Sequence, residues 1–270
     1  MPLDPYVLSD KDFGNFQRFI FDAAGITLTS AKKSLVCGRL AKRLHARQVE
    51  SYADYFRLLQ SGTDPVEVQS AVDLLTTNET YFFRESKHFD LLERLARTDT
   101  SRQTYRVWSA ACSTGEEPYS IAMVLNEALS GRAFEVVGTD ISTRVLVRAR
   151  TGHYPEQRAR LIPMPYLKRY CLKGQGEHEG TLLITRGLRE KIRFVHANLN
   201  DTLPDMGLFD VIFLRNVMIY FNNDTRRNVV ARVLAHLKPG GYFCIGHSES
   251  LNDVTREVEQ VAPSVYRKPL

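Results

Sequence analysis

The chain has 270 residues, of which 43% are hydrophobic and 25% charged, with a formal net charge of +5 at pH 7. This length predicts one or two domains, and the composition is that of an ordinary globular protein. No apolar run reaches the length of a membrane span, and residues 1–5 do not resemble a signal peptide, so we expect a cytoplasmic protein. The four cysteines form no CxxC pair and the seven histidines show no ligand spacing, so we expect no metal site.

The first eighty residues predict a helical domain. Four segments have apolar residues every three or four positions, and Ser9, Gly25 and Pro65 are typical of helix ends. We expect helices over residues 9–25, 31–48, 52–59 and 65–75, and a connecting helix over 87–97. We therefore divide the chain into a helical domain over 1–85 and a second domain over 86–270.

One of these helices has an uneven charge distribution. Residues 31–47 contain six basic side chains and no acidic one. Four of them, Lys32, Arg39, Arg43 and Arg47, fall in one narrow stripe at roughly 100° per residue. A solvated helix face is the default interpretation of this basic stripe, but the lack of acids favours an acidic protein surface as its partner.

The segment 78–84 places three aromatic residues between polar ones. An aromatic plug between domains explains Phe82 and Phe83, but it does not explain Asn78, Thr80 and Arg84, whose polar groups would need partners there. The segment is therefore a candidate site.

From residue 105 onward, strands and helices alternate, which predicts an α/β fold with a doubly wound sheet. Strands are expected over 105–111, 134–139, 192–197, 209–214 and 241–246, with a poorly marked hairpin near 257–266. The sequence Lys-Pro-Gly-Gly at 238–241 predicts a helix stop and a turn. The alternation fails over about 155–190, where two short strands (166–172 and 181–185) around a glycine turn predict an inserted antiparallel lobe.

The beginning of this sheet predicts a nucleotide-binding crevice. Residues 107–120 run from an apolar strand through a small-residue loop into a helix, and the next strand ends on Asp140, which can bind ribose hydroxyls. There is no GxGxxG, and Glu116 and Glu117 stand where a pyrophosphate would need bare amides. The loop therefore favours a nucleoside with a positive charge and an amino group, a description that S-adenosylmethionine (SAM) fits.

Polar residues also follow the later strands. Asn198 and Leu199 can hold the edge and the face of an adenine, but an ordinary Asn turn explains them equally well. Arg215 and Asn216 follow the next strand at the mouth of the crevice. Alternatively, Arg215 caps the sheet and Tyr220 belongs to the core.

Five motifs in this order resemble those of the CheR family of chemotaxis receptor methyltransferases. They are NxTxFFRE from Asn78, STGEEPYS from Ser113, Asn198-Leu199, RNVMIYF from Arg215 and GHSE from Gly246. The resemblance covers nearly the whole chain. It implies a SAM-dependent methyltransferase domain that esterifies glutamate side chains of chemoreceptors and releases S-adenosylhomocysteine.

The resemblance also implies roles for individual residues. Asn78, Thr80 and Arg84 would reach the methionine part of SAM, with Arg84 near the transferred methyl, and Tyr220 would lie close to this methyl and to the incoming carboxylate. Glu117 would contact the polar tail of SAM and Asp140 its ribose. Asn198 and Leu199 would hold the adenine, and Arg215 and Asn216 would line the same pocket. A carboxylate is already a nucleophile and a sulfonium an activated donor, so positioning and a dry site supply much of the rate. No catalytic base is expected.

Two receptor contacts follow from the same resemblance. The basic stripe would face the glutamate-rich methylation helices of the receptor. The inserted lobe, with Lys173, Gly174 and Gly176, looks like a subdomain that docks a receptor's C-terminal tail peptide. Lys173 stands where an arginine is usual, which keeps the charge but loses the bidentate fork. The membrane would be reached only through the receptor, and no nucleic acid is expected as a partner.

Two alternative functions are weighed against this one. An RNA methyltransferase is suggested by the isoelectric point near 9.0, but an Asn-Pro-Pro-Tyr motif and a catalytic Cys motif are missing and the basic stripe is short. A non-catalytic SAM-binding signalling module is disfavoured because Arg84, Glu117, Asp140 and Tyr220 are all present.

Overall fold

The computed structural model describes residues 7–270, which form two compact units. The helical unit runs through Thr77 and includes residues 220–225, and the sheet unit comprises residues 78–219 and 226–270. The sequence expectation for residues 1–5 lies outside the described residues. Within residues 7–270, no helix combines the length and the apolar character needed to span a membrane.

The helical unit contains the expected four helices. They are α1 (Asp10–Ala24), α2 (Lys33–Arg47), α3 (Tyr52–Ser61) and α4 (Pro65–Leu75), with a 3₁₀ turn, η1 (Ser30–Lys32), before α2. Ser9 caps α1 by accepting the Asp12 N–H at 3.1 Å, and Gly25 ends it with a φ of 70°. Phe16 is fully buried against the rings of Tyr52 and Tyr55, so the apolar faces of these helices form one core.

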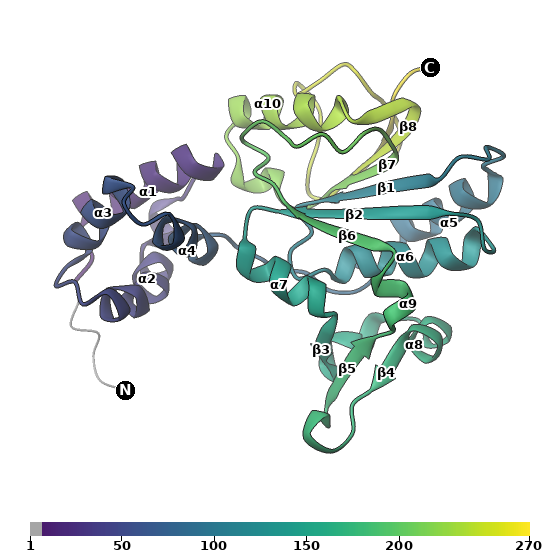
Figure 1. The fold of residues 1–270 in the computed structure, drawn as a ribbon. Coiled ribbons are helices and arrows are strands. Elements are labelled where there is room, and N and C mark those ends of the chain that lie inside the picture. Colours follow the sequence, from purple (N-terminus) through teal and green to yellow (C-terminus); the bar gives the residue numbers. More distant parts are fainter. Residues whose placement is uncertain (1–6) are drawn as a thin grey trace. The chain divides into compact units, whose positions relative to one another are not determined.

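The sheet unit is built on a seven-stranded sheet in the order β6-β2-β1-β7-β8-β10-β9 (Figure 1). The strands are β1 (Tyr105–Ala110), β2 (Phe134–Asp140), β6 (Ile192–His196), β7 (Phe209–Leu214), β8 (Leu237–Ile245), β9 (Glu259–Ala262) and β10 (Val265–Arg267). The first five in spatial order are parallel, whereas β10 and β9 are antiparallel. This arrangement confirms the predicted α/β fold.

Some helices of this unit cover the sheet, and others belong to the inserted lobe. They are α5 (Lys87–Thr98), α6 (Glu116–Ala128), α7 (Thr143–Thr151), α8 (Met164–Tyr170), α9 (Arg186–Arg189) and α10 (Asn223–Leu234), with 3₁₀ turns η2 (Glu156–Leu161), η3 (Gly176–His178) and η4 (Met218–Tyr220). Within the sheet unit, α6 packs on one face of the sheet and α10 lies on the other (Figure 1).

The strand register brings the candidate residues to one edge of the sheet. In β1, Ala110 lies beside Thr139 of β2 and Leu214 of β7. The residues that follow these three positions therefore begin at the same level, at the carboxyl ends of parallel strands, which is where α/β folds bind their ligands.

The inserted lobe differs from its prediction in one strand. Residues 164–170 form α8, and only Cys171–Lys173 continue as a strand, β4. Pro163 and Pro165 favour a helix start here, and Tyr170 of the helix is buried. The antiparallel sheet has the order β3-β5-β4, with β3 (His153–Pro155) missed by the prediction and β5 (Thr181–Ile184) expected.

Two boundaries also differ. The expected turn at 238–241 lies inside β8, because Leu237 already pairs with Phe209 before the register shifts. The two units divide between Thr77 and Asn78, eight residues before the expected boundary. Segment 78–85 belongs to the sheet unit because its main chain bonds to side chains there.

Candidate functional site

The loop after β1 is fastened to the end of β2 by Asp140. Asp140 is 6% exposed, and its carboxylate accepts the Ser113 N–H at 2.8 Å and the Ser142 N–H at 2.9 Å. The turn into α6 requires glycine, because Gly115 has a φ of 95° and a Cβ there would lie 2.9 Å from the Ala149 Cβ. These contacts hold the acid in a fixed orientation at the edge of the sheet.

Segment 78–84 contains no helix or strand and is fixed by side chains of the sheet unit. The Ser113 hydroxyl donates to the Asn78 carbonyl at 2.9 Å. The Phe83 N–H donates to the Ser120 hydroxyl at 3.0 Å. The main chain that carries Asn78, Thr80 and Arg84 is therefore attached to the loop after β1 and to α6.

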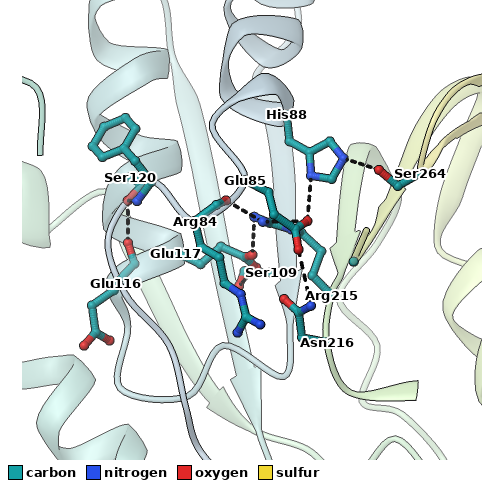
Figure 2. A network of polar contacts seen from close by, with 12 residues as sticks. Arg84, Glu85, His88, Ser109, Glu116, Glu117, Ser120, Arg215, Asn216 and Ser264 are labelled. Atoms are coloured by element: carbon teal, nitrogen blue, oxygen red, sulfur yellow. Dashed lines mark hydrogen bonds and ion pairs between the residues drawn. The ribbon is translucent and has the colours of Figure 1, made fainter. Parts of the chain in front are cut away.

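A buried ion-pair network joins this segment to β1 and β7 (Figure 2). The Arg215 side chain is 2% exposed and lies 3.0 Å from both Glu85 Oε2 and Glu117 Oε2. It also donates to the Arg84 carbonyl, and the Ser109 hydroxyl donates to Glu117 Oε1 at 2.7 Å. Burial raises the pKa of Glu117, although Arg215 opposes that rise. One guanidinium thus compensates two largely buried carboxylates.

Five residues near this network, none of them glycine, have a left-handed main chain. They are Phe83, Glu85, Ala111, Ser113 and Asn216, with φ values between 50° and 63°. Such conformations cost on the order of 1–3 kcal/mol each and persist only where surrounding contacts enforce them. Their concentration beside the carboxyl ends of β1 and β7 supports a functional site at this edge.

The two candidate catalytic residues lie in different units. Arg84 donates to the Glu79 carbonyl at 3.1 Å, its guanidinium lies 5.6 Å from the centre of the Tyr81 ring, and it points away from the ion pairs (Figure 2). Tyr220 belongs to the helical unit, where its carbonyl accepts the Thr27 N–H at 2.8 Å. Their roles at the methyl group stay predictions.

The candidate adenine and pocket residues have partners within the protein. The Asn198 side chain accepts the Asn200 N–H at 3.0 Å, which is the alternative Asn turn, and Leu199 is 7% exposed. Asn216 Nδ2 donates to Glu85 Oε1 at 3.3 Å. Direct contacts of these residues, of Arg215 and of Glu117 with a cofactor stay predictions.

The basic stripe of α2 has partners within the helical unit. Arg43 Nε donates to Glu67 at 2.9 Å, Arg47 lies 2.8 Å from Asp64, and Arg39 donates to the Leu74 carbonyl at 3.0 Å, whereas Lys32 is exposed. The lack of acids within residues 31–47 therefore does not leave the stripe without acidic partners, and its contact with a receptor stays a prediction. The acids come from α4 and its cap, about twenty residues further along the chain.

A carboxylate that the sequence reasoning left without a role fastens the loop after β7. Glu249 accepts the N–H groups of Asn216 and Gly246 at 2.8 and 2.7 Å through one oxygen, and that of Met218 at 2.8 Å through the other. A Cβ on Gly246 would lie 2.5 Å from Asn216 Nδ2. Glycine and glutamate of the GHSE motif thus shape the site, and the motif itself was the available signal.

Two histidines and a glutamate also form a cluster beside the network. Glu85, His88 and His247 place three possible metal-ligand atoms within 4.8 Å of one another. Glu85 Oε2 already pairs with Arg215 at 3.0 Å, so the Arg215 guanidinium supplies the positive charge that a metal ion would otherwise provide there. His88 Nε2 lies 2.8 Å from the Ser264 hydroxyl, and burial lowers the pKa of His88 to about 4, which keeps the ring neutral at pH 7.

The chain matches two family models over nearly its whole length. Residues 11–76 match the CheR methyltransferase all-alpha domain, and residues 78–267 match the CheR methyltransferase SAM binding domain. The chain belongs to the CheR methyltransferase family. The predicted membership is thereby confirmed, and the family's own division falls between residues 76 and 78, close to the division between the two units.

Relatives in the family are similar over most of their length. The chemotaxis protein methyltransferase of Escherichia coli is 40% identical over 265 residues, covering 96% of this chain and 91% of the relative. Chemotaxis protein methyltransferase 2 of Pseudomonas aeruginosa is 42% identical over 260 residues, covering 95% and 92%. Among solved structures, TrmN from Thermus thermophilus aligns with a TM-score of 0.42 at 18% identity, covering 67% of this chain and 48% of TrmN.

SAM is the cofactor of this family domain, and the residues at the sheet edge are suited to it. The buried Asp140 carboxylate suits the two hydroxyls of a ribose. Glu116 and Glu117, in the first turn of α6, pair with Arg158 and Arg215, so their charges are compensated within the protein. The fit to SAM therefore rests on the Asp140 carboxylate at the carboxyl ends of the strands.

We expect Asp140→Asn to weaken the binding of SAM and of S-adenosylhomocysteine alike, by about tenfold or more, because a charge-assisted hydrogen bond contributes roughly 1.5–3 kcal/mol. The amide would also present a donor to one of the two N–H groups that Asp140 accepts. Calorimetric titration measures both affinities, and Asp201→Asn on the exposed loop after β6 is the matched control. An unchanged affinity for both ligands would contradict the ribose assignment.

Proposed function

We propose that this methyltransferase transfers the methyl group of SAM to glutamate carboxylates of chemoreceptors and forms methyl esters. The observation that carries the proposal is the match of residues 78–267 to the CheR SAM binding domain. Relatives that are 40–42% identical and named chemotaxis protein methyltransferases support the chemotactic role.

The site residues would contribute mainly by positioning. When bound, SAM supplies an already activated methyl group, and a glutamate side chain is itself an anionic nucleophile. Asp140 would orient the ribose, and Arg84, on its firmly anchored segment, would pair with the incoming carboxylate. Because no proton must be removed from a carboxylate, the mechanism requires alignment and exclusion of water rather than a general base.

The proposal is tested by methyl transfer from tritiated SAM to chemoreceptor-containing membranes. We expect label on the receptor that is released as methanol by alkali, because carboxylate esters are base-labile. Arg84→Ala should bind SAM measurably and label the receptor poorly. Label that resists alkali or appears on added RNA supports the RNA methyltransferase instead, and SAM binding without transfer supports the non-catalytic module.

We also propose that the edge of the inserted lobe docks an acidic receptor tail as an added strand. In this lobe β5 is flanked on both sides, so β3 and β4 provide the strand edges. Lys173 ends β4, and its side chain is 76% exposed. Gly174 cannot be replaced without a shift of the loop, because a Cβ there would lie 1.9 Å from the His178 carbonyl oxygen. Gly176 has a φ of 59°.

Lys173→Glu is expected to weaken the binding of tail peptides from the receptors of the source organism, because it reverses the charge beside the proposed docking edge. Deletion of residues 174–176 should abolish peptide binding while SAM still binds. Fluorescence anisotropy with labelled peptides measures both effects, and Lys168→Glu on the exposed side of α8 is the control. If no receptor tail binds the intact protein, the lobe has another purpose.

A further inference from the structure

One side chain of the inserted lobe reaches the segment proposed to bind the methionine part of SAM. Arg158 lies in η2, and its Nη1 donates to the Thr80 carbonyl at 3.0 Å. The same nitrogen lies 2.7 Å from Glu116 Oε1 in the first turn of α6. Arg158 therefore connects three segments that are far apart in the sequence.

The carboxylate that anchors Arg158 is fully buried. Glu116 is 0% exposed, and its second oxygen accepts the Thr114 hydroxyl at 2.6 Å. Burial raises the pKa of Glu116, while Thr114 and Arg158 oppose the rise. The buried acid thus fixes where the guanidinium can lie, and the guanidinium in turn fixes Thr80.

A second contact from the lobe lies two residues further along the segment. Tyr154 of β3 donates its hydroxyl to the Thr114 carbonyl at 2.7 Å, and its ring lies 5.1 Å from the ring of Phe82 in an edge-to-face arrangement. The anchors at Asn78, Phe83 and Arg84 come from the loop after β1, α6 and the end of β7. By contrast, the hydrogen bond to the Thr80 carbonyl comes from Arg158 of the inserted lobe.

We infer that Arg158 is a positioning residue that holds Thr80 in the geometry needed to bind SAM. This inference rests on the proposed cofactor contact of the segment 78–84. It gives the inserted lobe a second task besides peptide docking, because the lobe supplies part of the frame of the cofactor site. Removing Arg158 frees the Thr80 carbonyl and leaves the buried Glu116 without its cation.

The test separates these two consequences. Arg158→Gln should raise the Kd and the KM for SAM by about threefold to tenfold, the range for one lost hydrogen bond, and leave the KM for the receptor unchanged. Arg158→Gln combined with Glu116→Gln removes the uncompensated charge but does not restore the anchor on Thr80, so SAM binding should stay weak while the melting temperature recovers. Arg158→Lys should recover part of the affinity.

Arg160→Gln is the matched control, because Arg160 is an exposed arginine on the same 3₁₀ turn. Wild-type SAM affinity in Arg158→Gln would overturn the inference, and so would full recovery of affinity in the double variant, which would reduce Arg158 to charge compensation. Because Kd is measured without any receptor, the result stands apart from the proposed function. A wild-type protein that binds SAM but methylates no receptor refutes that function and leaves this comparison valid.

Discussion

Replacement of Arg215 by methionine is expected to lower the free energy of unfolding by about 3–5 kcal/mol, the range for breaking a buried ion pair. The Arg215 side chain is 2% exposed and pairs with Glu85 and Glu117. Without the guanidinium, two largely buried carboxylates lose the cation that pairs with both of them. Urea denaturation followed by circular dichroism measures the loss.

The loss in Arg215→Met should depend on pH. Burial alone would raise the pKa of Glu85, but Arg215, the main opposing influence, and hydrogen bonds lower it below the usual 4.5. In the wild type the charged Glu85 therefore stabilises the folded protein at any pH above its pKa in the unfolded chain. This stabilisation is lost as the pH falls through the lower pKa that Glu85 has in the folded protein. The variant lacks this contribution, so the difference between the two proteins should shrink in acid.

Two comparison variants make the Arg215 result interpretable. Adding Glu117→Gln to Arg215→Met should restore part of the stability, because it neutralises one of the two stranded carboxylates. Arg102→Met on an exposed loop should change the free energy of unfolding by less than about 0.5 kcal/mol. Equal stability of Arg215→Met and wild type at pH 7 would show that the network contributes nothing to the fold.

Charge reversal at Arg43 is expected to destabilise the helical unit by about 3 kcal/mol, at the low end of the range for a buried pair because the arginine side chain is 30% exposed. Its partner Glu67 is 2% exposed and also accepts the Tyr55 hydroxyl at 2.6 Å. Burial would raise the pKa of Glu67, but Arg43, Tyr55 and Arg47 together lower it. Arg43→Glu would place a second carboxylate against this one.

The control for Arg43 is its neighbour. Lys42 is exposed, so Lys42→Glu should change stability by less than about 0.5 kcal/mol. Thermal denaturation of both variants distinguishes them, and a melting temperature equal to wild type in Arg43→Glu would contradict the structural role. Only exposed cations such as Lys32 and Lys42 can therefore test whether α2 faces an acidic receptor surface.

Local patterns were sufficient to predict most elements. Helix α4 and strand β7 have the predicted bounds, because Asp64 and Pro65 start one and a continuous apolar run defines the other. The same patterns misassigned residues 166–170, where aromatic and apolar residues suit a strand as well as a helix. The two prolines decided in favour of the helix.

Tertiary pairing could not be predicted from these patterns. The sequence showed a basic run on α2 but not that Glu67 would face it. Likewise, Arg215 and Glu85 are 130 residues apart, and nothing around Arg158 indicated a contact with Thr80. The family motifs named the residues of the site, whereas the contacts that hold those residues depend on the fold.

The helical unit is not continuous along the chain. Ile26 forms a β-bridge with Phe221, and the Thr27 N–H donates to the Tyr220 carbonyl, so a stretch from the second half of the chain completes the unit. During synthesis the ribosome releases α1 to α4 long before residue 221. Co-translational folding of this unit must therefore remain unfinished until most of the sheet has also been made. A fragment cut after Thr77 would lack residues 220–225 and expose the amide of Thr27.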